Sequence, residues 1–363
     1  ADGNNWERAY EYAKKSNQLL KTTLPGRDGE YTYDRHGNMV KMPHLPLMRW
    51  DFEDQLTATA RQVVESGKGT PETTYYVYNV SGQRVRKVME RFAAEGETPT
   101  RMKERIYLGG YEIYREYGGD GKKITLKRET LHVMDDEQRI AVVETKTIDD
   151  QEQSLAWNEG TKPRIRYQLG NHLGSAVLEL DGDGAEISYE EYYPYGSTAY
   201  QAGRNGAEVG LKRYRYTGKE KDEESGFYYH GARYYACWLG RWISVDPQAE
   251  KQIPESTYSG MDNNPTIYID STGEIPDYNL HYTYPERRAE QRQNNKQKTG
   301  TLGTFLKAVG QGITGIFTGL YRGSKRLIKN VSSKQREEQA RENLQVIKIL
   351  GKIVKAGISI KNS

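Results

Sequence analysis

The 363-residue sequence has few of the residues that usually fill a protein core or cross-link a fold. It contains one cysteine, Cys237, and five phenylalanines, and only 35% of its residues are hydrophobic. A single cysteine excludes an internal disulfide framework. The core must therefore rely on the 29 tyrosines, each of which buries a large ring but keeps a hydroxyl that needs a partner. A sheet with one aromatic face and one wet face suits this composition better than a compact globule does.

The first residues, ADGNNWERAYEYAKK, also lack a methionine, an apolar run and a recognisable signal peptide. We therefore expect the chain to begin inside a longer polypeptide. Residues 5–22 predict a helix, which Pro25-Gly26 would end, so that 1–26 would be an N-terminal helix and linker. The residues at roughly helical spacing are Trp6, Ala9, Tyr10, Ala13 and Leu20.

From residue 27 to about residue 200, short alternating segments are separated by Gly and Asn turns, which is typical of β-hairpins. EYTYDRHGN and TYYVYNVSGQ are variants of one unit, and DGDGAEISYEEYYPYG repeats it loosely. A Tyr-x-Tyr strand enters a turn at Asp34 or Asn79, and Gly37 or Gly82, three residues later, supplies the positive φ. Side chains alternate along a strand, so both tyrosine rings should share a face. Hairpins that cannot each bury a face are expected to stack into an elongated or closed sheet.

These stretches resemble the tyrosine-aspartate (YD) repeats of the Rhs family. YQLGNHLGSAVLELDGDGAEISYEEYYPYGS, followed by RYRYTGKEKDEESGFYYHGARYYACWLGRWISVDP, resembles the Rhs repeat-associated core domain. The family includes bacterial polymorphic toxins and the C components of insecticidal toxin complexes. The resemblance implies a mainly β fold, in which an antiparallel ribbon spirals into a hollow shell and ends in a core plug. It implies shell strands at 27–159, a core at 160–274 and an enclosed, variable C-terminal effector.

The resemblance also implies that the core cuts its own chain, using two aspartates and an arginine. The matching residues are Arg233 in GARYY, Asp246 in GRWISVDP and Asp270, which opens DSTGE. Cleavage would fall between Glu274 and Ile275. The chain would then be an intramolecular aspartyl autoprotease.

The chemistry of these residues also supports a proteolytic role without the family resemblance. Two carboxylates brought close together cannot both ionise cheaply, so one keeps a proton, which provides a base to activate water and an acid to protonate the amide. An arginine can anchor a carboxylate, and a scissile bond in the same chain has an entropic advantage. The alternative is that Asp246 and Asp270 merely start turns. Ser271 and Glu274 stand where the family usually has proline and leucine, so weak or absent cleavage stays open.

The aromatic stretch 228–247 is predicted to form a rigid, partly dry wall that positions the two aspartates. Its members are Tyr228, Tyr229, Tyr234, Tyr235, Trp238 and Trp242. Arg241 is a second candidate arginine, which we expect to pack on Trp242. The six histidines show no metal spacing, so neither a bound metal nor a small-molecule cofactor is expected.

The net charge of the chain changes sign near residue 275. Residues 275–363 hold 17 Lys and Arg against 6 Asp and Glu, a net of +11, which leaves −8 for 1–274. Apolar stripes predict helices at 302–320 and 344–360. This segment is expected to be a basic helical effector or the stub of one. It could be a packing face alone, or bind a target-cell membrane or nucleic acid.

The sequence therefore favours the C-terminal part of a toxin-delivery protein, secreted or delivered by a secretion system or toxin complex. Its expected partner is the N-terminal remainder of the shell or a B-type toxin-complex component. One alternative is a structural or adhesive YD-repeat shell protein without proteolysis. Another is a carbohydrate-binding surface module with exposed tyrosine and tryptophan rings.

Overall fold

A computed structural model describes residues 7–64, 68–135, 138–150, 163–249 and 256–274. Within these ranges the chain is mainly β, as predicted. The helices predicted at 302–320 and 344–360 lie outside the described residues, as does Ile275.

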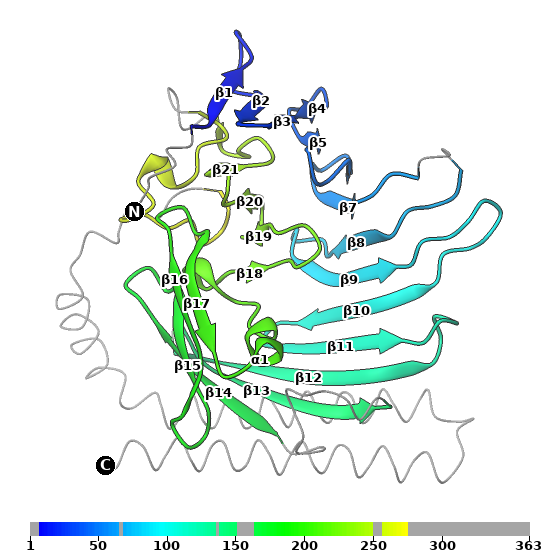
Figure 1. The fold of residues 1–363 in the computed structure, drawn as a ribbon, viewed down its shortest axis with the longest axis vertical. Helices are drawn as coiled ribbons and strands as arrows, with labels where there is room; N and C mark the ends of the chain where they lie inside the picture. The colour runs from blue at the N-terminus through cyan, green and yellow to red at the C-terminus, as the bar shows by residue number, and fades with distance from the viewer. Residues whose placement is uncertain (1–6, 65–67, 136–137, 151–162, 250–255, 275–363) are drawn as a thin grey trace. The chain divides into compact units, whose positions relative to one another are not determined.

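A twelve-stranded antiparallel sheet dominates the described chain (Figure 1). Each strand pairs with the next one in sequence, and β6 and β17 are the two end strands. The sheet continues across residue 160, because β13 pairs with β14. The strands are β6 (Leu47–Trp50), β7 (Leu56–Ala60), β8 (Thr73–Tyr78), β9 (Arg84–Glu90), β10 (Arg101–Leu108), β11 (Tyr111–Tyr117), β12 (Ile124–Asp135), β13 (Gln138–Asp149), β14 (Arg164–Gly170), β15 (Ala176–Leu180), β16 (Glu186–Tyr192) and β17 (Thr198–Gly203).

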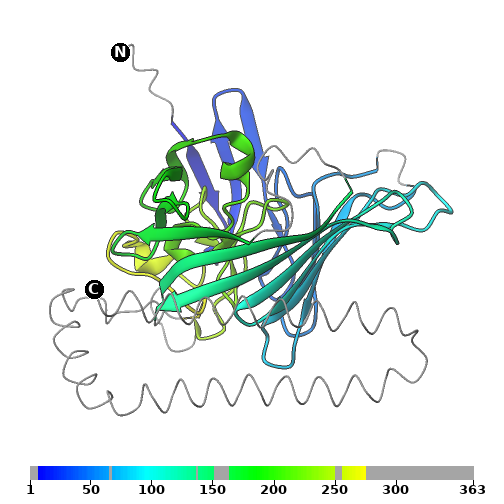
Figure 2. The same cartoon turned by 90° about the horizontal axis from the view of Figure 1, so that it is seen from below.

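Smaller sheets precede and follow the large one in sequence. The remaining elements are β1 (Ala9–Tyr12), β2 (Leu19–Leu24), β3 (Arg27–Glu30), β4 (Thr32–Tyr33), β5 (Met39–Lys41), α1 (Gly206–Gly210), β18 (Glu220–Lys221), β19 (Tyr228–Tyr229), β20 (Tyr234–Ala236) and β21 (Arg241–Trp242), with 3₁₀ turns at Tyr216–Gly218 and Met261–Asn263. Figure 2, seen from below, shows the twist of the large sheet. In the described ranges, no helix is both long and apolar enough to cross a membrane.

The helix predicted over 5–22 is wrong, because β1 and β2 are antiparallel strands there. Leu19 is fully buried, whereas its neighbour Leu20 is 38% exposed. Tyr10 and Tyr12 stack on one face with ring centroids 6.4 Å apart. Strand pairing therefore overrides a helical spacing that rested on few residues. Pro25-Gly26 does end a segment, but it forms the turn between β2 and β3.

One five-residue turn recurs at the hairpin ends. An Asp or Asn opens it, and its side-chain Oδ1 accepts hydrogen bonds of 2.9–3.0 Å from the amides two and four residues later. The opening amide itself donates to the carbonyl four residues later. The turns open at Asp34, Asp51, Asn79, Asn171 and Asp181. The predicted turns at Asp34 and Asn79 are thus confirmed, and Gly37 and Gly82 have the expected positive φ.

Both tyrosines of a Tyr-x-Tyr strand face the same side, as predicted. The Tyr76 ring lies 5.6 Å from the Tyr234 ring, and the Tyr78 hydroxyl is 2.9 Å from the Tyr234 hydroxyl. The residues that follow β17 therefore pack on one face of the large sheet. The core lies between them, and Tyr76 and Tyr234 are only 3% and 2% exposed.

Buried ion pairs join the same two layers. Arg84 in β9 bonds Asp222 at 2.8 Å and Glu220 at 2.6 Å, and Lys87 bonds Asp222 at 2.9 Å. All four residues are buried. A buried charge is tolerated only when it is paired, so these contacts fix how the two layers fit together.

Candidate active site

Arg233, Asp246 and Asp270 meet at one point, although 37 residues separate the first from the last in sequence. Arg233 precedes β20, Asp246 follows β21, and Asp270 lies beyond the 3₁₀ turn at Met261–Asn263. The Arg233 Nη2 atom is 2.8 Å from Asp246 Oδ2 and 3.4 Å from Asp270 Oδ2. All three residues are buried. One guanidinium nitrogen therefore contacts both carboxylates, which brings the two acids within reach of each other.

Asp246 opens a turn as well as contacting Arg233. Its Oδ1 accepts a 2.6 Å hydrogen bond from the amide of Gln248, which leaves Oδ2 for Arg233. Burial raises the pKa of Asp246 above the ordinary value of 3.8, although Arg233 opposes that shift, and the nearby Glu274 charge adds to it. Asp246 is thus an acid that holds its proton to a higher pH than usual.

Asp270 is fully buried and folds the residues after it around its own carboxylate. Its Oδ1 accepts hydrogen bonds from the amides of Gly273, at 2.6 Å, and Thr272, at 3.2 Å. Its Oδ2 lies on the side of Arg233. The turn-forming role that the sequence suggests for both aspartates is therefore compatible with a shared contact to Arg233.

The backbone of residues 270–274 is hydrogen-bonded at every carbonyl. Each of its five carbonyl oxygens accepts a hydrogen bond from a residue between 219 and 233. The pairs are His230 Nδ1 to Asp270 at 2.6 Å, Lys219 Nζ to Ser271 at 2.6 Å, the Ala232 amide to Thr272 at 2.9 Å, Arg233 Nε to Gly273, and Arg233 Nη2 to Glu274 at 3.1 Å. The segment that ends at the expected cut is thus fixed through its main chain.

Two glycines allow this close approach. A Cβ atom on Gly231 would lie 2.8 Å from the Thr272 carbonyl oxygen, and one on Gly273 would lie 2.9 Å from the Arg233 amide nitrogen. Both glycines have positive φ, at +111° and +78°. Any side chain at either position would force the two segments apart.

Arg233 lies over the ring of Trp242, with its Cζ 4.3 Å from the ring centroid. The prediction that Arg241 packs on Trp242 is wrong. Arg241 and Trp242 are neighbours in β21, and neighbouring side chains in a strand point to opposite faces. Arg241 instead lies over Tyr12, 5.0 Å from the ring centroid.

The aromatic stretch is shared between two clusters, and Trp238 packs against both. Tyr235 and Trp242 belong to a cluster next to Arg233, and their ring centroids are 5.2 Å apart. Tyr234 belongs to the cluster that contacts Tyr76 of the large sheet. The first cluster supports the site, whereas the second attaches this region to the sheet.

Sequence reasoning missed His230 and Lys219. His230 is 2% exposed, and burial lowers its pKa to about 3, so its ring is neutral at ordinary pH. The Asp270 carbonyl can only accept, so Nδ1 must carry the ring proton. Only its place next to GARYY could have pointed to His230, and nothing in the sequence points to Lys219.

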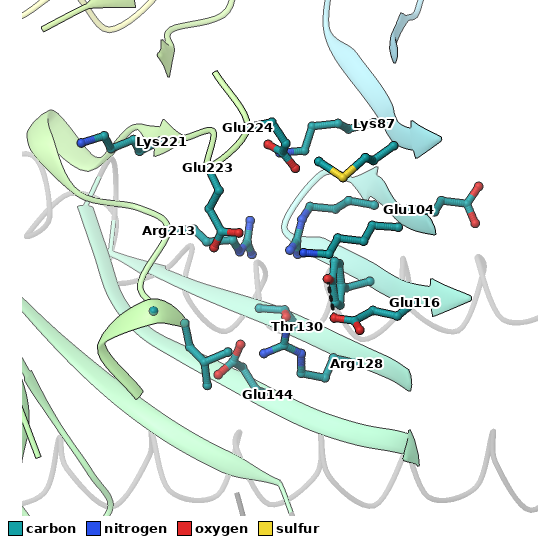
Figure 3. Close-up of a pocket in the computed structure, with 16 residues that line it drawn as sticks. Lys87, Glu104, Glu116, Arg128, Thr130, Glu144, Arg213, Lys221, Glu223 and Glu224 are labelled. Carbon is teal, nitrogen blue, oxygen red and sulfur yellow. Dashed lines mark hydrogen bonds and ion pairs between the residues drawn. The ribbon is translucent and has the colours of Figure 1, made fainter. Parts of the chain in front are cut away.

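A separate cavity of about 180 Å³ lies on the large sheet, and none of Arg233, Asp246 and Asp270 lines it (Figure 3). Four neighbouring strands line this cavity. The residues that face one another across these strands are Lys87, Arg105, Tyr114 and Arg128. Carboxylates of this chain already pair with the first two cations. Across the described ranges, no group of three or more His, Cys, Asp or Glu could hold a metal ion.

An antiparallel sheet in which one Asp or Asn turn closes several hairpins defines this chain as a YD-repeat β protein. It is 31% identical over 304 residues to toxin subunit YenC2 of Yersinia entomophaga, across 75% of this chain and 29% of that protein. It resembles a Photorhabdus luminescens Tc holotoxin pore with a TM-score of 0.59 and 26% identity, across 75% of this chain and 13% of that one. It also resembles TcdB2-TccC3 without its hypervariable C-terminal region, with a TM-score of 0.57 and 26% identity, across 73% and 13%.

The chain belongs to the Rhs/YD-repeat family and is homologous to toxin subunits of toxin complexes. No family model matches it. The chain spans less than a third of the length of YenC2.

Proposed function

We propose that this chain is the C-terminal part of an Rhs/YD-repeat toxin-delivery protein. Its β-shell would enclose a C-terminal toxin, and its core would release that toxin by cutting the chain after Glu274. One observation carries the proposal: Arg233 Nη2 contacts the carboxylates of Asp246 and Asp270 and donates to the Glu274 carbonyl at 3.1 Å. That carbonyl belongs to the bond at which the cut is proposed.

Each residue has a role in the proposed hydrolysis. Arg233 polarises the Glu274 carbonyl and stabilises the negative charge that grows on its oxygen. Asp270 takes a proton from the attacking water, whose oxygen bonds to the carbonyl carbon. Asp246, with its raised pKa, gives its proton to the Ile275 nitrogen as the carbon–nitrogen bond breaks. The products are a carboxylic acid at Glu274 and a free amine at Ile275.

The proposed shell needs more chain than is present here. TccC3, to which this chain is similar, occurs in a complex with TcdB2 and has a hypervariable C-terminal region. By analogy, we propose that the N-terminal remainder of the shell or a B-type component completes the enclosure, and that the protein is secreted or delivered by a toxin complex. Residues 275–363 would be the basic cargo, directed at a membrane or a nucleic acid.

Self-cleavage can be tested on a denaturing gel of the expressed 363-residue chain. The expected result is two fragments, with the smaller one beginning at Ile275 by N-terminal sequencing. Asp246→Asn and Asp270→Asn should each leave the chain whole and folded, because asparagine keeps the shape of aspartate but cannot serve as acid or base. The matched control Asp181→Asn, in a hairpin turn, should be cut normally. An intact wild-type chain would favour a structural or adhesive shell protein without proteolysis.

A further inference from the structure

The contacts that hold residues 270–274 on the core pass through the backbone more than through the side chains. All five carbonyls are bound, whereas Thr272 is exposed and Ser271 and Glu274 are partly exposed. We propose that the cleavage site recognises the main chain of 270–274, and that His230 and Lys219 are its positioning residues. This inference rests on the self-cleavage proposed above.

His230 fixes the first carbonyl of the segment. Its Nδ1 donates to the Asp270 carbonyl at 2.6 Å, and its ring meets Trp242 edge to face at 5.0 Å between centroids. Because Trp242 also carries Arg233 on its face, one ring sets the positions of both donors. Among the described residues, His230 makes no hydrogen bond to the Glu274 carbonyl or to a carboxylate oxygen, so it acts through the segment that it holds.

Lys219 fixes the second carbonyl. Its Nζ donates to the Ser271 carbonyl at 2.6 Å. Lys219 directly follows Gly218, whose φ is +68°, at the end of the 3₁₀ turn at Tyr216–Gly218. The side chain is therefore presented from a tight turn that precedes Arg233 in sequence.

The order of the donors along the segment explains why two residues outside the reacting groups matter. His230, Lys219 and the Ala232 amide take the first three carbonyls, and Arg233 takes the last two. Without the upstream donors, Arg233 alone would have to hold the segment as well as polarise its last carbonyl. A displacement of about 1 Å at the reacting bond can slow a reaction about 100-fold.

Paired substitutions test the positioning role in the full-length chain. At position 230, His230→Asn keeps a hydrogen-bond donor on the atom that follows Cγ, whereas His230→Leu removes it. At position 219, Lys219→Arg keeps a cationic donor, whereas Lys219→Met removes it. The chain is pulse-labelled in cell-free translation, and the uncut fraction is followed over time. We expect His230→Leu and Lys219→Met to slow cutting at least about tenfold, and His230→Asn and Lys219→Arg to stay within about threefold of wild type.

Backbone recognition makes a second, separable set of expectations. Ser271→Ala and Glu274→Leu should cut within about threefold of wild type, because both substitutions keep the backbone carbonyls through which the segment is proposed to be recognised. Gly273→Ala should lose cutting, since its new methyl group would meet the Arg233 amide at 2.9 Å. Gly184→Ala is the matched control: its φ is +80°, but nothing lies within 4 Å of the added Cβ. That variant should cut normally.

Folding is checked independently of activity in the uncut Asp246→Asn background. There, hydrogen exchange at the amides of Thr272 and Gly273 should be faster with His230→Leu than with His230→Asn, while the large sheet exchanges equally in both. Equal exchange and equal cutting in the two His230 variants would overturn the positioning role while leaving self-cleavage intact. Slow cutting in Ser271→Ala and Glu274→Leu would overturn backbone recognition. If the wild-type chain is not cut, the proposed function fails and this inference falls with it.

Discussion

Two segments of this chain share the pattern Asp-x-x-Gly but differ in what completes them. In DRHGN, Asp34 Oδ1 accepts from the amides two and four residues later, and the Asp34 amide donates to the Asn38 carbonyl. In DSTGE, Asp270 Oδ1 accepts from the amides two and three residues later, and the last carbonyl, that of Glu274, accepts from Arg233. The first turn binds its last carbonyl with its own amide, whereas the second offers its last carbonyl to a distant side chain.

Burial distinguishes two aspartate–arginine pairs of this chain. Asp181 and Arg204 pair at 2.6 Å with 18% and 41% of their side chains exposed, and the hydrogen bond from Arg204 lowers the pKa of Asp181. At Asp246 the contact to Arg233 is 2.8 Å, yet burial raises the pKa. The same pair of residue types thus gives an ordinary carboxylate in water and a proton-holding acid in the interior.

The largest effect is expected from exchanging aspartate for asparagine in the two segments. Asp270→Asn should slow self-cleavage at least about a thousandfold, because the proposed catalytic unit loses its base. Asp34→Asn should leave it unchanged, since asparagine opens the same turn at Asn79 and Asn171. The uncut fraction on a denaturing gel measures both. Similar cutting in the two variants would mean that Asp270 has no role in cleavage beyond opening a turn, as Asp34 does.

Breaking a buried ion pair should cost far more stability than breaking an exposed one. Lys87→Met leaves Asp222 and Glu224 buried without this partner, and we expect a loss of about 3–5 kcal/mol in the free energy of unfolding. Lys21→Met breaks the exposed pair with Asp28 and should change the free energy of unfolding far less, because water screens this pair. Urea unfolding of an uncut variant gives both values, and equal losses would contradict this ranking.

Replacing the arginine tests whether its geometry or only its charge matters. Arg233→Lys should slow cutting roughly 100-fold, because lysine cannot reach two carboxylates and two carbonyls from one planar group. Arg204→Lys, at the exposed pair, should not alter cutting. Wild-type cutting rates in Arg233→Lys would reduce the role of this residue to charge neutralisation.

The rate of cutting should fall as the pH rises. The raised pKa of Asp246 means that this carboxyl keeps its proton above the ordinary value of 3.8 and loses it as the pH passes the raised value. If Asp246 is the acid, the rate follows that protonated fraction downward. Initial rates from about pH 4 to about pH 8 test this. A rate that rises steadily over this range would assign the proton elsewhere.

A further prediction concerns acid stability. His230 has a folded pKa of about 3 against an ordinary 6.5, so only the unfolded chain takes up this proton between those values. Its contribution is present above pH 6.5 and is lost as the pH falls, by roughly 1.4 kcal/mol per pH unit. In the uncut Asp246→Asn background, His230→Asn should remove that slope from urea unfolding measured at successive pH values. An unchanged slope would mean that His230 is already protonated when folded.

Interactions that close within a few residues were predictable from the sequence. An aspartate or asparagine followed by glycine three residues later makes its turn with its own amides, as at Asp34 and Asn79. Alternation along a strand likewise put Tyr76 and Tyr78 on one face. The motifs singled out Arg233, Asp246 and Asp270 because they resemble those of a known family.

Only the tertiary structure decided interactions whose partners lie far apart in sequence. Residues 9–12 and 19–24 are strands because they pair with each other, and Arg241 lies over Tyr12 instead of Trp242 because β21 turns it to that face. His230 and Lys219 gain their roles from carbonyls 40 and 52 residues away. Sequence spacing specifies hydrogen bonds that a segment makes with itself, but a carbonyl bound by a distant donor leaves no local pattern, so the fold alone determines which donor reaches it.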